Sequence, residues 1–576
     1  MPLQPKRWSI APPIPEDLQE ELPFHKLLQQ LLYNRGIVDA EMARAYVSAE
    51  GSLYDPFLIK DMEIAVERLY QALNRDESIT VYGDYDADGV TATAMLLDFL
   101  SKLGANVKSY TPDRFDEGYG LNKDAIREIA EDGTNLLITV DCGIRSVGEV
   151  ELAVELGMDV LLTDHHLPGD VLPPAVAILD HKQEDDTYPE KVLCGAGIAY
   201  KLIEAYLSRY PYGGLNARDW LDLVAIATVA DIVPLTGENR ALIKAGLAVI
   251  QEQKRIGLTA LIRAAGQDPA SMKASHIAFG VGPRINAAGR IASARNAIDL
   301  LLTQDSHSAS LLAQQLDDIN ARRKDKTAHV QELVEEDTNG DGEEPADGFL
   351  IFTVSPDFHM GVVGLAAGRL SERYYRPAVA GAMGERLTRA SCRSIPEFHI
   401  TRALDECADL FDESLGERYG GHAAAAGFTI SNDKLPQLEQ RLTELAEEDL
   451  AGRELIPTVQ VDVDFNFTYL IRNKQHIYRL VQLLEPTGTE NPPVLFAARG
   501  LRVVNAFTVG KDHSHLRLKL SDGYTSEDAI AFRMGHLKDE LPPYVDILFT
   551  LDENTYRGQT TFQIQVRDIR EAEMAD

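Results

Sequence analysis

Residues 78–166 alternate between short apolar runs and segments with helical periodicity. The apolar runs are "SITVYG" (78–83), "ANVKSYTP" (105–112), "NLLITVD" (135–141) and "MDVLLTDHH" (158–166). An alternation of this kind predicts a mostly parallel sheet with helices on both faces. Because the chain has 576 residues, more than one core usually holds, further domains are expected.

Polar side chains gather where the predicted strands end. Three of the strands run into the clusters DYDAD, DCG and TDHH, and a further acid follows a predicted helix in "ATVADIVPL". The carboxyl ends of parallel strands meet at one sheet edge, where open α/β sheets bind their ligands. The residues expected at this edge are Asp86, Asp88, Asp141, His165, His166 and Asp231.

Several carboxylates at one edge need compensating positive charge. Two like charges ~4 Å apart cost about 4 kcal/mol at an effective dielectric of 20. Divalent cations remove this penalty, and a set of carboxylates with imidazole suits Mn²⁺, with Mg²⁺ also possible. Two such ions about 3.5–4 Å apart can activate water and stabilise the leaving oxygen of a phosphoryl group. The pattern therefore predicts a hydrolytic site with two divalent metal ions.

A calcium loop and a structural zinc site are both excluded. Asp84, Asp86 and Asp88 match the opening of an EF-hand loop, but its last ligand position holds Met95 instead of glutamate. The four cysteines form no CxxC pair, which argues against zinc and disulfides and favours a reducing cytoplasm. The longest apolar runs are too short to span a bilayer.

The rest of the chain consists of segments with different predicted secondary structure. Leu301 to about Asp337 lacks Gly and Pro and predicts one long helix, followed by an acidic linker at 337–348. A second α/β segment comes next, and about five short strands near the C-terminus predict a small barrel of OB type. The expected divisions are an N-terminal segment (1–55), a parallel-sheet domain (56–250), a helical region with the long helix (251–345), the second α/β domain (346–455) and the barrel (456–576).

The net charge of −34 argues against a protein that coats nucleic acid through bulk electrostatics. A local basic groove is still compatible with it. Between residues 366 and 395 the only acids are Glu372 and Glu385, against the arginines Arg369, Arg373, Arg376, Arg386, Arg389 and Arg393. This balance fits either a solvated helix face or a path for a polyanion.

"TDHH" (163–166), with "DYDADG" before it and "ATVADIVPL" after it, closely resembles the DHH phosphoesterase superfamily. The motifs "GPRINAAGR" (282–290), "HMGVVGLAAGRL" (359–370), "SCRSI" (391–395) and "GGHAAAAGF" (420–428) resemble its bacterial branch of single-strand-specific 5′→3′ DNA exonucleases. The resemblance implies a DHH domain and a DHH-associated domain joined by the long helix, with an OB barrel at the end. Its 5′ polarity comes from the resemblance alone.

The resemblance also implies roles for single residues. It gives Asp86, Asp88, Asp141, His165 and Asp231 as metal ligands, with Asp141 between the two ions and His166 beside the phosphate. Asp84 is expected to support its loop. Many members place a histidine ligand four residues before Asp86, but this chain has Tyr82, a poor ligand at neutral pH.

Substrate contacts are expected from both halves of the chain. Arginine suits this role because its planar fork engages phosphate through two hydrogen bonds. The candidates for the 5′-phosphate and the backbone are Arg114, Asn286, Arg290, Ser391, Arg393 and His422. In the barrel, charge and stacking surface for a single strand are expected from Lys511, Arg517, Lys519, Phe507 and Tyr524.

The sequence thus predicts a metal-dependent exonuclease that degrades single-stranded DNA from its 5′ end to mononucleotides. One alternative keeps the chemistry and takes short oligonucleotides or cyclic dinucleotides; another is an inactive replication scaffold. The resemblance implies DNA repair and recombination, with single-strand-binding protein and a helicase as partners. We expect a cytoplasmic monomer that has no membrane association.

Overall fold

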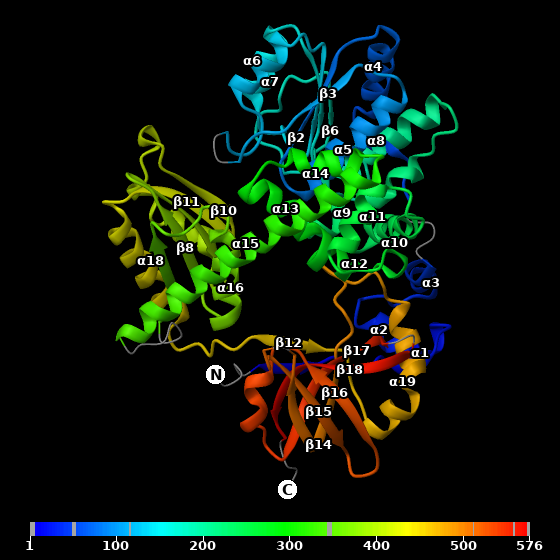
Figure 1. The fold of residues 1–576 in the computed structure, drawn as a ribbon, viewed down its shortest axis with the longest axis vertical. Helices are drawn as coiled ribbons and strands as arrows, with labels where there is room; N and C mark the ends of the chain where they lie inside the picture. The colour runs from blue at the N-terminus through cyan, green and yellow to red at the C-terminus, as the bar shows by residue number, and fades with distance from the viewer. Residues whose placement is uncertain are drawn as a thin grey trace.

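The protein is described by a computed structural model, which covers residues 6–48, 53–114, 117–341, 348–510, 512–556 and 559–572. Its first sheet lies at one end of the molecule and a β-barrel at the other (Figure 1). A second α/β unit lies to one side, and one long helix runs toward it from the first unit (Figure 1). This arrangement confirms the predicted fold class.

The first unit is built on a five-stranded parallel sheet in the order β3-β2-β4-β5-β6. Its strands are β2 (Ile79–Gly83), β3 (Val107–Tyr110), β4 (Leu136–Val140), β5 (Asp159–Thr163) and β6 (Ala177–Leu179). The first four match the predicted runs. The fifth was missed because it has only three residues and follows a proline-rich stretch.

Helices cover both faces of this sheet, with α6 and α7 on one side and α4, α5 and α8 on the other (Figure 1). Every residue of β2 and β4 is therefore buried, which explains their continuous apolar sequences. The helices of this unit are α4 (Met62–Asn74), α5 (Ala87–Lys102), α6 (Lys123–Glu131), α7 (Val147–Glu155), α8 (Gly195–Arg209), α9 (Leu221–Ala230) and α10 (Gly237–Gln251).

The helical region follows in the chain, and its buried apolar side chains belong to the same core as those of the first unit. It comprises α11 (Ile256–Ala264), α12 (Ala274–His276), a π-helical turn (Ile277–Val281), α13 (Gly282–Ile291), α14 (Arg295–Leu302) and α15 (Ser306–Asp341). The long helix starts later than predicted, because α14 ends at Leu302, and it runs into the expected linker as far as Asp341. The remainder of that linker, 342–347, lies outside the described residues.

The second α/β unit has a five-stranded sheet in the order β10-β11-β9-β8-β7, in which only β7 and β8 are parallel. Its elements are β7 (Ile351–Ser355), α16 (Val363–Tyr374), β8 (Ala378–Met383), β9 (Leu387–Arg393), α17 (Ile400–Asp405), β10 (Arg418–His422), β11 (Ala425–Ser431) and α18 (Leu435–Leu450). Helix α15 packs on α16 and so connects the two units.

The barrel closes because β14 pairs with both β15 and β17. The C-terminal elements are β12 (Thr458–Val461), β13 (Val463–Asp464), α19 (Phe467–Gln482), β14 (Phe496–Val509), β15 (His515–Ser521), β16 (Ser526–Ala531), β17 (Tyr544–Tyr556) and β18 (Gln559–Glu571). Closure removes the free strand edges that would otherwise invite pairing with other chains.

The N-terminal segment packs on the barrel although it is far away in sequence. Its elements are β1 (Arg7–Ile10), α1 (Glu16–Glu21), α2 (Lys26–Tyr33) and α3 (Ala40–Ser48). Strand β1 runs parallel to β12, and leucines of α2 belong to the barrel's apolar core. On the other side, the Arg240 guanidinium donates to four backbone carbonyls between Leu483 and Pro486, which fixes the barrel to the first unit. Within the described residues, no helix has the length and apolar character needed to cross a membrane.

Candidate metal centre and strand-binding surface

The loops at the carboxyl ends of β2, β4 and β5 meet the end of α9 at one point. His165, directly after β5, lies at the centre of this group. Its Nε2 is 3.1 Å from Asp141 Oδ1, 3.7 Å from Asp231 Oδ2 and 3.8 Å from Asp88 Oδ2. The fold therefore brings these residues together, as the sequence predicted.

Two helix N-termini hold the carboxylates of the first loop. Asp86 caps α5, and its side chain accepts hydrogen bonds from the backbone N–H groups of Asp88 and Gly89. The two oxygens of Asp88 accept from the N–H groups of Gly195 and Ala196 in the first turn of α8, at 2.6 and 2.7 Å. These bonds fix both carboxylates before any ligand arrives.

Glycine is required where these helices approach the loops. A Cβ on Gly89 would lie 2.5 Å from the carbonyl oxygen of Asp84, and a Cβ on Gly195 would lie 2.7 Å from the Cβ of Asp141. Any larger residue would push α5 or α8 away from the site. The two glycines thus set how closely the helix N-termini come to the acidic loops.

The ligand atoms fall into three overlapping groups whose members lie within 4.8 Å of one another. These groups are Asp84–Asp86–Asp141, Asp88–His165–Asp231 and Asp141–His165–His166. Asp141 and His165 each belong to two of them. Asp84, expected only to support its loop, also presents its carboxylate to Asp86 and Asp141.

Several of these buried atoms have no hydrogen-bond partner among the described residues. They are Asp84 Oδ1, Asp141 Oδ1 and both ring nitrogens of His165. A buried polar atom without a partner is costly, so a group of them converging on one point fits the binding of a cation. The donor set of carboxylates and imidazole fits Mn²⁺ or Mg²⁺.

The pKa values in the cluster reflect burial first and repulsion between the carboxylates second. Burial, with the charge of Asp86, raises the pKa of Asp88 to about 7. Burial and the neighbouring Asp88 raise the pKa of Asp231 to about 9, and the same two causes raise the pKa of Asp141 well above its usual range. Burial and His166 lower the pKa of His165 to about 3, which keeps this imidazole neutral and able to bind a metal.

Asp164, the first residue of the DHH motif, was not assigned a role from the sequence. Its Oδ1 accepts from the backbone N–H of His165 and lies 2.7 Å from His166 Nδ1, and its Oδ2 accepts from the Ile144 N–H. Burial would lower the pKa of His166, but the hydrogen bond to Asp164 and the negative charges of Asp164 and Asp88 together outweigh it and raise that pKa. Asp164 therefore positions the two histidines instead of facing the metal site.

Tyr82, at the position where many relatives of the superfamily have histidine, points away from the ligands. It is fully buried, its hydroxyl donates to the Gly120 carbonyl at 3.0 Å, and its ring stacks on Tyr110. Burial raises its pKa further above the ordinary value. Tyr82 thus holds the loop after β3 and does not serve as a ligand.

Three of the predicted substrate residues form one cationic group near the metal loop. Arg114 lies over the ring of Tyr85, 5.0 Å from its centroid. Burial and the charges of Arg114 and Arg323 lower the pKa of Arg290 to about 10, with Arg393 also contributing. Among the described residues the Arg290 guanidinium has neither a hydrogen bond nor an ion pair, which leaves it available for an anion.

The remaining predicted substrate residues occupy different positions. Asn286 Oδ1 accepts from the Ala87 N–H at 2.8 Å, so it secures the start of α5. Ser391 and Arg393 stand near Gly364 at the N-terminus of α16, where a Cβ would lie 3.3 Å from Ser391 Oγ and 3.5 Å from Arg393 Nη2. His422 is exposed and lines a pocket that it shares with His166 of the first unit.

In the barrel, both predicted stacking residues are accessible. Tyr524 is 91% exposed and Phe507 is 44% exposed. Arg517 makes an ion pair with Asp528 at 3.2 Å, and Lys519 is exposed on the same strand. Lys511 lies outside the described residues.

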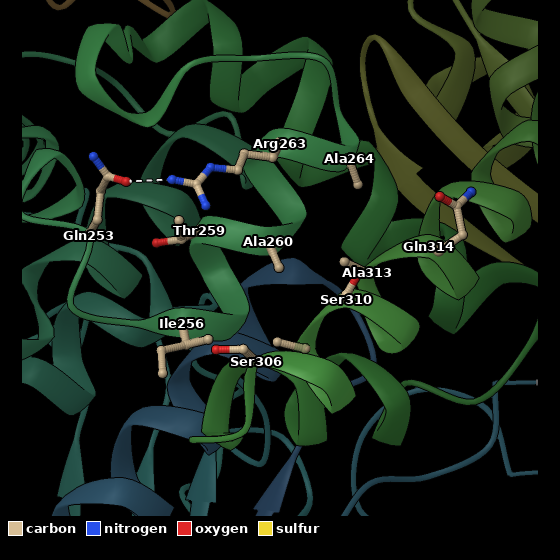
Figure 2. Close-up of a pocket in the computed structure, with 11 residues that line it drawn as sticks. Gln253, Ile256, Thr259, Ala260, Arg263, Ala264, Ser306, Ser310, Ala313 and Gln314 are labelled. Atoms are coloured by element: carbon tan, nitrogen blue, oxygen red, sulfur yellow. Dashed lines mark hydrogen bonds between the residues drawn. The ribbon is translucent and has the colours of Figure 1, made fainter.

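A separate pocket of about 470 Å³ lies between α11 and the first turns of α15. Figure 2 shows its small side chains and the hydrogen bond from Arg263 to Gln253. None of the described residues that line it is acidic or a histidine. It offers no ligand set for a metal and lies apart from the cluster at the sheet edge.

Comparison with known proteins identifies three parts of the chain. Family models match the N-terminal domain of the DHH family at residues 78–228, the DHHA1 domain at 346–448 and the RecJ OB domain at 461–568. The single-stranded-DNA-specific exonuclease RecJ of Bacillus subtilis (strain 168) is 36% identical over 570 residues, covering 98% of this chain and 70% of the relative.

Solved structures give the same result. RecJ from Thermus thermophilus in complex with Mn²⁺ has a TM-score of 0.83 at 31% identity, over 98% of this chain and 80% of that one. The same protein in complex with Mg²⁺ has a TM-score of 0.76 at 30% identity, over 98% and 79%.

Proposed function

The chain belongs to the RecJ family of single-stranded-DNA-specific exonucleases, and from this we propose that it hydrolyses single-stranded DNA from the 5′ end to 5′-mononucleotides. The observation that carries the proposal is the convergence of Asp141, His165 and their acidic neighbours on one point, with unpartnered buried atoms. It is an enzyme of phosphodiester hydrolysis that uses divalent cations.

The chain's own residues prepare the reaction centre. We assign Asp86, Asp88, Asp141, His165 and Asp231 as the metal ligands, with Asp84 as a further candidate in the same cluster. When bound there, two ions such as Mn²⁺ or Mg²⁺ supply water activation and charge stabilisation of the leaving oxygen. His166, held by Asp164, is placed to contact the scissile phosphate.

We infer that the cationic side chains bind the terminal 5′-phosphate of the strand. Arg114 and Arg290 adjoin the metal loop, Arg393 of the second α/β unit acts electrostatically on Arg290, and Ser391 stands with Arg393 near Gly364. A terminal 5′-phosphate has more charge than an internal phosphate and suits this group of arginines. These side chains would hold the 5′ end beside the metal loop.

The barrel and the distribution of charge also suit a single-stranded DNA substrate. Exposed Phe507 and Tyr524 suit base stacking, which binds single strands without sequence preference. The net charge of −34 repels nonspecific polyanions, while the local arginines admit a threaded end. We propose that the enzyme acts as a cytoplasmic monomer in DNA repair and recombination, with single-strand-binding protein and a helicase supplying the strand. Its four free, buried cysteines fit a reducing compartment.

The test is digestion of an internally labelled single strand with Mn²⁺, with either the 5′ or the 3′ end blocked. We expect the 5′ block alone to abolish release of mononucleotides. Asp141→Asn is the control for the site, because Asn tolerates the left-handed backbone of Asp141 (φ 61°). Cleavage that persists with the 5′ block would overturn the proposed polarity.

A second comparison addresses the small-substrate alternative. The barrel and the 36-residue helix α15 provide an extended surface that a dinucleotide cannot use. Rates on a dinucleotide and on a 50-mer should therefore differ strongly in favour of the longer strand. A faster reaction on the dinucleotide would favour the alternative.

A further inference from the structure

A lysine beside the metal centre has no assigned role. Lys182 follows β6 at the carboxyl edge of the sheet, where its backbone N–H donates to Asp180 Oδ1 at 2.8 Å. The residue lies at the same edge as Asp141 and His165, just after the strand of this sheet that the sequence did not reveal. Neither the ligand set nor the arginine group described above includes it.

Lys182 lines a pocket of about 580 Å³ that opens beside His166. This volume falls in the range of about 300–1,000 Å³ that is usual for sites of small ligands. The loops after β3, β4 and β5 contribute Tyr119, Ile144 and His166, and the second α/β unit contributes His422. The pocket therefore lies where the two units face each other, next to the reacting atoms.

The ammonium group of Lys182 is unpaired in the part of the chain that the structure describes. No carboxylate lies within ion-pair distance of it there. The pocket wall also holds the acids Glu149 and Asp164, and Asp164 already uses its oxygens for His166 and for backbone N–H groups. A half-buried cation without a partner costs free energy, so an anion supplied from outside would be stabilising here.

The pocket adjoins the metal ligands through His166. Lys182 and His166 line the same pocket. His166 also belongs to the group with Asp141 and His165, whose ligand atoms lie within 4.8 Å of one another. An ammonium in this pocket wall can therefore face a phosphate that is bound beside the ligands.

We propose that Lys182 contacts a non-bridging oxygen of the scissile phosphate. This inference rests on the proposed function and adds a substrate-contacting residue to it. Lysine is suited to the role because its ammonium is a compact point charge that can follow the phosphate through the reaction. The arginines of the 5′-phosphate group do not line this pocket, so their roles and that of Lys182 are distinct.

The first experiment compares Lys182→Gln with wild type on a 5′-phosphorylated single strand at saturating Mn²⁺. Loss of a charge-assisted hydrogen bond should lower kcat/KM about 10- to 100-fold. Lys182→Arg should recover part of this loss. Lys254→Gln removes the same charge from an exposed site paired with Glu252 and should leave kcat/KM unchanged.

The second experiment separates a direct contact from an effect on the ligands. Strands with an Rp or an Sp phosphorothioate at the first linkage each replace one non-bridging oxygen by sulfur. If Lys182 contacts one of these oxygens, sulfur there should slow wild type more than Lys182→Gln, while the other isomer slows both equally. Equal effects of both isomers on both enzymes would overturn the proposal.

The controls distinguish failure of the proposed function from failure of the role proposed for Lys182. Wild type that releases no mononucleotides would contradict the proposed function itself. Wild type that is active while Lys182→Gln has the same kcat/KM would contradict only the role of Lys182. The melting temperature of Lys182→Gln should match wild type because the ammonium has no partner to lose, and a large decrease would assign a structural role instead.

Discussion

Asp141 Oδ1 and His165 Nε2 lie 3.1 Å apart, yet neither atom has a hydrogen-bond partner within the described residues. The two side chains come from the ends of neighbouring strands β4 and β5. Both are buried, so neither is satisfied by bulk water. The pair is therefore arranged to bind a ligand that contacts both atoms, and a divalent cation meets that requirement.

The first prediction concerns this pair. Asp141→Asn removes one charge from a cluster of repelling carboxylates, so the metal-free variant should be more stable than wild type by about 1 kcal/mol or more. Mn²⁺ at 100 times its Kd should stabilise wild type by about 2.7 kcal/mol and the variant far less. Thermal unfolding with EDTA and with Mn²⁺ measures both effects. A variant that is less stable without metal would contradict the account of repulsion.

The second prediction concerns the anchor of His166. Asp164→Asn weakens the 2.7 Å contact to His166 Nδ1 and should lower kcat about 10- to 100-fold. If Asp164 acts through His166, combining it with His166→Ala should cost no more than His166→Ala alone. Single-turnover rates of the two single variants and the double variant measure this coupling. Losses that multiply would show an independent role for Asp164.

How far the sequence leads can be judged from single residues. The strand ends carrying Asp86, Asp141 and His165 were predictable because parallel strands place their carboxyl ends at one edge. Lys182 was missed because β6 has only three residues and follows a proline-rich stretch. The use of Asp164 as an anchor could not be foreseen either. Alternation along a strand gives the side of the sheet, but only the fold determines which of three adjacent polar residues faces the ligands.

The third prediction concerns the 5′-phosphate. Arg290→Ala and Arg393→Ala should each weaken binding of a 5′-phosphorylated strand and reduce the salt slope of log K by about 0.7. A strand with a 5′-hydroxyl should lose less, because its terminal charge is already absent. Arg386→Ala is the matched control, since Arg386 immediately precedes β9, whose last residue is Arg393. Unchanged affinity and salt slope in Arg393→Ala would contradict a basic path for the strand.

The fourth prediction concerns acid stability in the second α/β unit. Burial alone would raise the pKa of Glu417, but Lys434, Ser431 and two backbone N–H groups hold that pKa down to about 2. The folded pKa is below the unfolded value of about 4.3, so this stabilisation is complete above that pH and is lost as the pH falls toward 2.

Glu417→Gln should therefore destabilise the protein by about 1–3 kcal/mol at pH 7 and lose less stability between pH 4.5 and 2 than wild type. Denaturant unfolding as a function of pH measures the difference. Glu447→Gln, on the exposed face of α18, should follow the wild-type curve. Parallel curves for Glu417→Gln and wild type would show that the contacts of Glu417 do not set its pKa.

The fifth prediction concerns a strained residue next to a ligand. Ile232 follows Asp231 with φ at 61°, and its side chain is 71% exposed. A left-handed conformation costs a β-branched residue about 1–2 kcal/mol. Because the side chain is exposed, it makes few packing contacts that could offset this strain. Asn adopts this conformation more readily, so Ile232→Asn should raise the free energy of unfolding by about 1 kcal/mol.

The comparison that isolates strain is Ile64→Asn. Ile64 is 50% exposed in helix α4, where its backbone is unstrained, so the same substitution should give no gain and a small loss of helix propensity. Denaturant unfolding of both variants, without metal, measures the difference. A gain in both would come from removing exposed apolar surface. A gain in Ile232→Asn alone shows that the turn that aims Asp231 into the cluster is held under strain by the packing around it.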